Sequence, residues 1–137
     1  MSLSPAPGVV RRALLSVSNK DGLVDFARSL HELGVALVAS GGTGRALRDA
    51  NIPVASVTEF TGANEVLEGR VKTLHPRVHA GILADRRKPD HMTELESEDY
   101  LPIDLVVCNL YPFQKVLSQG AERDVMVENF DIGGPTL

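Results

Sequence analysis

Residues 69–81 contain more polar chemistry than a protein core normally holds. The segment reads Gly-Arg-Val-Lys-Thr-Leu-His-Pro-Arg-Val-His-Ala-Gly, so cations, imidazoles and a hydroxyl lie between two glycines. Its polar and apolar residues follow neither the 3.6-residue period of an amphipathic helix nor the strict alternation of a half-buried strand. The segment therefore predicts contact with an anion.

A second anion site is indicated by Ser40-Gly-Gly-Thr43, which lies between an apolar run and a helical pattern. Glycines let backbone N–H groups approach an anion, hydroxyls can donate, and a helix N-terminus favours negative charge. A tight strand-to-helix turn with a Ser or Thr cap would use the same residues. Lys20 favours the phosphate interpretation because a phosphate also attracts a cation. The spacing matches neither the dinucleotide fingerprint nor a Walker loop.

The elements that must position these residues follow from the apolar pattern. Short apolar runs predict buried strands over 12–17, 35–39 and 105–108, and a weaker strand over 54–57. Helical spacing predicts helices over 21–33, 45–50 and 88–100; Ser18 and Asn19 offer N-cap oxygens to the first, and Gly34 is its C-cap glycine. This alternation predicts an α/β fold with three layers, a mainly parallel sheet carrying helices on both faces.

In such a sheet, ligands bind beyond the carboxyl ends of the strands. The residues that directly follow three predicted strands are Ser18 to Lys20, Ser40 to Gly44, and Asn109 to Tyr111. We expect these three loops to share one rim.

Length and composition limit the class of protein. The chain has 137 residues and 43% hydrophobic residues, which suits one compact domain over 11–137 behind a loose tail over 1–10. Its net charge of −4 argues against a nucleic-acid surface. The single cysteine, Cys108, permits no internal disulfide or thiolate metal cluster, and we expect it to end a buried strand rather than act as a nucleophile. With no apolar run of ~20 residues and no export signal, a cytoplasmic protein without a membrane partner is expected.

His75 and His79 are four residues apart and could ligate a metal from one helical face. No third ligand lies at a suggestive spacing, and Pro76 lies between them. We expect no metal site, and structural hydrogen bonds for both imidazoles.

Taken together, several motifs resemble one known family. They are Ser16-Val-Ser-Asn-Lys20, Ser40-Gly-Gly-Thr43, Gly69-Arg-Val-Lys-Thr-Leu-His-Pro76, His79-Ala-Gly-Ile-Leu83, Cys108-Asn-Leu-Tyr-Pro-Phe113 and Asp131-Ile-Gly-Gly134. The chain resembles the N-terminal inosine monophosphate (IMP) cyclohydrolase domain of bifunctional purine-biosynthesis enzymes, within the methylglyoxal-synthase-like superfamily. The resemblance implies a Rossmann-like fold of that superfamily.

The resemblance also implies a reaction, in which formylated aminoimidazole carboxamide ribotide (FAICAR) closes to IMP with loss of water. Lys72 would stabilise the formyl oxyanion and Tyr111 would donate its hydroxyl near the reacting amide, although Tyr111 could instead pack at a strand end. Asp131 would manage protons, or cap a helix, or both. The implied substrate-binding residues are Ser18, Lys20, Ser40, Gly41, Gly42, Thr43, Arg70, Thr73, Asn109, Gly133 and Gly134.

The ring closure implied by the resemblance needs no cofactor. In the complete family enzyme, a C-terminal transformylase domain uses 10-formyltetrahydrofolate, and the protein is a homodimer. Family domains continue through a helix with a second functional Lys, so a chain ending at Leu137 is expected to be incomplete and weakly active or inactive alone. The alternatives are methylglyoxal synthase, which leaves residues 69–81 unexplained, and a non-catalytic nucleotide-binding regulatory module.

Overall fold

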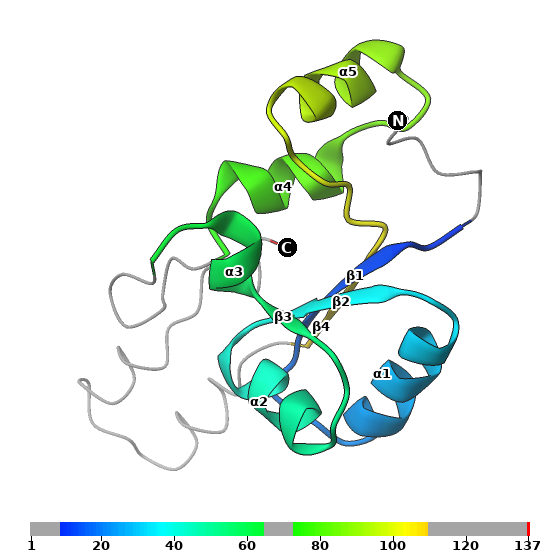
Figure 1. The fold of residues 1–137 in the computed structure, drawn as a ribbon, viewed down its shortest axis with the longest axis vertical. Coiled ribbons are helices and arrows are strands. Elements are labelled where there is room, and N and C mark those ends of the chain that lie inside the picture. Colours follow the sequence, from blue (N-terminus) through cyan, green and yellow to red (C-terminus); the bar gives the residue numbers. More distant parts are fainter. Residues whose placement is uncertain (1–8, 65–72, 110–136) are drawn as a thin grey trace.

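A computed structural model describes residues 9–64, 73–109 and 137. Its centre is a sheet of four parallel strands in the order β3-β2-β1-β4 (Figure 1). The strands are β1 (Arg12–Ser16), β2 (Ala36–Ala39), β3 (Ala55–Ser56) and β4 (Leu105–Cys108). The helices are α1 (Leu23–Glu32), α2 (Gly41–Asp49), α3 (Val57–Thr61), α4 (Pro76–Leu83) and α5 (Pro89–Ser97).

The strand order reverses at β1. From β1 the chain steps outward through β2 to β3, whereas β4 pairs with the opposite side of β1. Leu14 is therefore flanked by Val38 in one neighbour and Val106 in the other. In open parallel sheets such a reversal marks where ligands bind, beyond the carboxyl ends of the strands.

Two apolar clusters hold helices against opposite faces of the sheet. Leu15 packs with Ala27 of α1 and Leu47 of α2. Leu14, on the other face because side chains alternate along a strand, packs with Val57 of α3 and Val78 of α4. Figure 1 shows α1 and α2 on one side of the sheet and α3 and α4 on the other. The predicted three-layer α/β fold is confirmed.

The first helix begins later than predicted. Its N-cap is Gly22, with φ of 74° and no side-chain cap, so the predicted capping by Ser18 or Asn19 is wrong. The Asn19 side chain instead accepts the N–H of Asp21 (2.9 Å) and closes a local turn. At the other end Gly34 adopts φ of 85° and donates to His31 O (2.9 Å), which confirms the predicted C-terminal glycine.

The second helix begins earlier than predicted. Gly41 and Gly42 were expected to separate strand from helix, but both lie in the first turn of α2. Glycine permits unusual conformations without requiring them, and here the buried positions Thr43 and Leu47 continue the helical period back to Ser40, the N-cap.

Two helices were not predicted. α3 follows the two-residue β3, where a strand over 54–57 was expected; Ser56 Oγ accepts the N–H of Glu59 (3.0 Å), so the Ser-x-x-Glu capping signature was the overlooked signal. α4 begins at Pro76, a residue favoured in the first helical turn. His75 caps α4 through Nδ1, which accepts the N–H of Arg77 (3.0 Å).

Arg86 fixes the end of α4 against the segment that leads into β4. Its Nη2 donates to Gly81 O (2.9 Å) and to Ile103 O (2.8 Å), and its Nη1 donates to Ala84 O. A cation at a helix C-terminus satisfies carbonyls that have no partner within the helix. Arg86 thereby anchors the end of α4 to the segment that leads into β4.

The remaining elements differ from prediction mainly in burial. α5 is shorter than the predicted helix over 88–100, and its Met92 and Leu95 are buried. β4 has the predicted bounds but is only half-buried, because it is the edge strand of the described sheet. Cys108 is accordingly exposed, not buried as expected. Within the described ranges, no helix is long and apolar enough to cross a membrane.

Candidate functional site

The carboxyl end of β1 and the start of α2 are joined by one buried hydroxyl. Thr43 Oγ1 accepts the N–H of Val17 (3.0 Å) and donates to the carbonyl of Val17 (3.1 Å). Only 2% of Thr43 is exposed. Because a hydroxyl has a single proton, Thr43 cannot donate to an anion while it donates to Val17. Its side chain holds the loop together.

A second hydroxyl pair lies beside this contact. Ser40 Oγ is 3.1 Å from Ser16 Oγ, and either can donate. Ser40 caps α2 by its backbone conformation alone, since its side chain makes no cap hydrogen bond. Ser16 was absent from the predicted site, although it opens the Ser-Val-Ser-Asn-Lys motif and ends β1.

Lys20 brings a cation to the N-terminus of α2. Its Nζ donates to the carbonyls of Val17 (3.3 Å) and Ser18 (3.2 Å). A side chain placed on Gly42 would lie 3.7 Å from this Nζ. Lys20, Gly41 and Gly42 are all exposed, so the ammonium and the glycine turn face solvent together.

The first turn of α2 supplies further donors. The N–H groups of Gly41, Gly42 and Thr43 have no carbonyl partner within the helix, because the first turn of any helix lacks one. With the nearby ammonium and the positive end of the helix dipole, they form a site suited to a phosphate. We call Ser18 to Lys20 together with Ser40 to Thr43 the cradle.

Asn109 joins the carboxyl end of β4 to the cradle. Its Oδ1 accepts the N–H groups of Ser18 (2.5 Å) and Asn19 (3.2 Å), and its Nδ2 donates to Asn19 O (2.8 Å). The structure thus brings the ends of β1, β2 and β4 to one rim, as the sequence predicted.

Six of the predicted site residues lie outside the described ranges: Arg70, Lys72, Tyr111, Asp131, Gly133 and Gly134. Thr73 is described and is 3% exposed before α4, but it makes none of the cradle contacts. The cradle contains the residues that were predicted to hold the phosphate. That role remains a prediction, as do the roles of the predicted catalytic residues.

The two histidines of residues 69–81 differ in their hydrogen-bond partners. His75 makes the capping hydrogen bond described above, which confirms its predicted structural role. His79 Nε2 is buried without a hydrogen-bond partner in the described part of the chain, so no such bond is seen for it. Among the described residues, no three His, Cys, Asp or Glu side chains are grouped to hold a metal ion.

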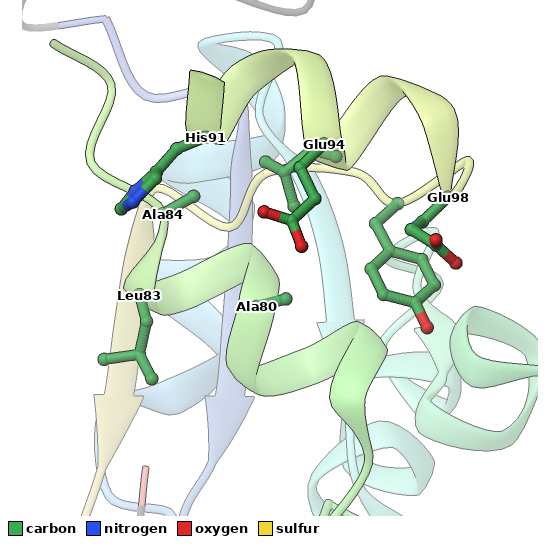
Figure 2. A pocket seen from close by; sticks show the side chains of 8 residues that line it. Ala80, Leu83, Ala84, His91, Glu94 and Glu98 are labelled. Carbon is green, nitrogen blue, oxygen red and sulfur yellow. The ribbon is translucent and has the colours of Figure 1, made fainter. Parts of the chain in front are cut away.

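A separate groove of about 210 Å³ lies between α4 and α5. Figure 2 shows Ala80 and Leu83 on one wall and Glu94 pointing from α5 toward α4. Among the residues that the structure describes, no predicted site residue and no Lys or Arg lines this groove. The described residues that line it are distinct from those of the cradle.

Comparison with known proteins identifies the family. A family model described as the MGS-like domain matches residues 22–136. The bifunctional purine biosynthesis proteins PurH of Brucella ovis and Brucella suis biovar 1 are each 53% identical to this chain over 135 residues, which cover 97% of this chain and 25% of each relative. The chain thus spans about a quarter of the length of these relatives.

A solved structure is also similar to this chain. The crystal structure of ForH superimposes with a TM-score of 0.76 at 34% sequence identity, covering 93% of this chain and 65% of that chain. The family model covers most of the sequence. The chain belongs to the MGS-like domain family.

Proposed function

We propose that the chain is an IMP cyclohydrolase domain that closes FAICAR to IMP with loss of water. The observation that carries the proposal is the cradle, where the Lys20 ammonium lies beside Gly42 at the N-terminus of α2. FAICAR and IMP both carry a 5′-phosphate that this site would hold. Similarity to PurH proteins, which are named for purine biosynthesis, supports this choice of substrate.

The reaction places few demands on the protein. The carboxamide nitrogen attacks the formyl carbon of the same molecule, and the resulting oxygen leaves as water after proton transfer. No second reactant must be captured and no redox step occurs, so we propose that the ring closure uses no cofactor. Holding the reacting groups in contact, and donating to the developing oxyanion, are the tasks left to the chain; one oxyanion donor contributes roughly 3 to 4 kcal/mol.

In this proposal the phosphate of the substrate is bound at the cradle, and the base extends toward residues 69–81. Lys72 stabilises the oxyanion, Tyr111 donates its hydroxyl near the amide, and Asp131 handles the carboxamide protons. Arg70 and Thr73 contact the substrate, as do Gly133 and Gly134. These roles come from the family resemblance, and they are proposals for this chain.

The larger protein is also part of the proposal. The chain would form the N-terminal domain of a cytoplasmic homodimer whose C-terminal domain formylates the ribotide with 10-formyltetrahydrofolate. The share of the PurH relatives that it spans, about a quarter, is consistent with such a second domain.

Calorimetric titration with IMP tests the phosphate site. We expect Lys20→Ala to weaken IMP binding roughly tenfold to a hundredfold, since a charge-assisted hydrogen bond contributes about 1.5–3 kcal/mol. Lys88→Ala, at the exposed N-cap of α5, is the matched control and should bind like the unsubstituted chain. Equal affinities for the two variants would contradict the phosphate site.

An absorbance assay with FAICAR separates the competing functions. Turnover that Lys72→Ala abolishes while IMP still binds supports the cyclohydrolase. IMP binding without turnover in any polypeptide containing this domain would favour a regulatory module. Release of phosphate from a triose phosphate, with no binding of IMP, would favour methylglyoxal synthase.

A further inference from the structure

Asn109 lies at the reversal of strand order, between the carboxyl ends of β1 and β4. Although it is exposed, its side chain makes three hydrogen bonds to the backbone of Ser18 and Asn19, some 90 positions away in the sequence. Within the described sheet, β4 is the neighbour of β1 on that side, and its carboxyl end therefore brings the Asn109 amide to this place.

These bonds use most of what the Asn109 amide can offer. The amide oxygen has two lone pairs, and it accepts from the N–H groups of both Ser18 and Asn19. One of the two amide protons is donated to Asn19 O. An amide occupied in this way has a single N–H left for a ligand, so it is poorly suited to recognise a substrate.

The loop that Asn109 holds is the one that carries the cradle's cation. Lys20 follows Asn19 directly, and its Nζ donates to carbonyls of the same loop beside Gly42. Thr43 fixes the start of this loop through Val17. Asn109 fixes the stretch between that contact and Lys20, so the position of the ammonium depends on both.

We propose that Asn109 is a positioning residue of the phosphate site: it locks the Ser18–Lys20 loop so that Lys20 faces the N-terminus of α2. This inference rests on the proposed function for the identity of the ligand, and it differs from the substrate contact that the family resemblance implies for Asn109. If Asn109 only positions the loop, its replacement should weaken the binding of ligands that carry a phosphate. If Asn109 contacts the base or ribose, its replacement should also weaken the binding of ligands without a phosphate.

The first test compares a ligand with and without the phosphate. Asn109→Ala should weaken IMP binding by about fivefold to tenfold, the equivalent of one net hydrogen bond. Inosine, which has the same base and ribose but no phosphate, should bind this variant as it binds the unsubstituted chain in an NMR titration. Asn51→Gly is the matched control, because Asn51 has φ of 60°, which glycine adopts freely, and lies at the other end of α2. An equal loss of affinity for IMP and for inosine would refute the positioning role and would favour direct contact of Asn109 with the base or ribose.

The second test needs no ligand. Amide hydrogen exchange followed by NMR should accelerate at Ser18 and Asn19 in Asn109→Ala, since both N–H groups lose their acceptor. Asn109→Asp keeps an acceptor oxygen and should retain slow exchange at both positions. The positioning role of Asn109 is refuted if exchange at Ser18 and Asn19 is unchanged in the alanine variant. It is also refuted if exchange in the aspartate variant is as fast as in the alanine variant. If exchange responds as expected but the unsubstituted chain does not bind IMP, the proposed function is wrong, whereas the conclusion that Asn109 holds the Ser18–Lys20 loop is kept.

Discussion

Replacing Thr43 by Val tests whether this hydroxyl holds the cradle or binds the phosphate. Valine has nearly the same shape and a similar helix propensity, so the change removes the hydroxyl and little else. The N–H and C=O of Val17 would then both lose the partner that Thr43 Oγ1 provides at 3.0 and 3.1 Å.

The magnitude follows from the burial of these groups. A buried backbone group left without a partner costs about 1–3 kcal/mol, and Val17 is half-buried, so water can replace part of the loss. We expect Thr43→Val to reduce the free energy of unfolding by about 2–3 kcal/mol, which corresponds to a fall in Tm of about 6–12 °C for a domain of this size. Thr43→Ser keeps the hydroxyl and should lose about 1 kcal/mol.

Urea unfolding followed by circular dichroism gives the two free energies, and titration with IMP gives the affinity. The reasoning is refuted if Thr43→Val unfolds with the same free energy as the unsubstituted chain. If it also loses affinity for IMP at unchanged stability, the Thr43 hydroxyl is a direct phosphate donor that leaves Val17 when the ligand binds.

Two further predictions concern the scaffold. Gly81→Ala should lower the free energy of unfolding by about 1–2 kcal/mol despite the better helix propensity of Ala, because its Cβ would lie 2.7 Å from the backbone oxygen of Leu101. Gly44→Ala is the control, because the nearest contact of its Cβ, at 3.2 Å, is a flexible Arg side chain. In the same urea measurement this control should be neutral or stabilising. Equal losses in the two variants would contradict this account of α4 packing. Hydrogen bonds from Arg87 hold the pKa of Asp85 well below its usual value of 3.8, so the stability that the pair contributes is present above about pH 4 and is lost as the pH falls below it. Thermal unfolding between pH 6 and 2 should therefore show a slightly shallower acid loss for Asp85→Asn, and identical profiles would show that this pair contributes nothing to stability.

The apolar pattern was sufficient to predict the sheet and the rim. Apolar runs separated by helical stretches favour parallel strands, because parallel neighbours must be joined by crossovers and crossovers are usually helices. The loops after three of these strands then fall on one edge, and the structure places Lys20, Ser40 and Asn109 there. Helix boundaries were predicted less well where the capping signals were local, as at Ser56, or where glycines joined a helix, as at Gly41.

The partners of the polar side chains were decided only by the tertiary structure. The sequence predicted that Thr43 and Asn109 belong to a substrate site at the rim, but not that Thr43 bonds to Val17, 26 residues away, or that Asn109 bonds to Ser18, 91 residues away. Strand order sets these pairs, and it depends on how the helices pack on the two faces of the sheet. The residue types thus predicted a phosphate site at the rim, whereas tertiary packing decided which of its side chains bond to the backbone.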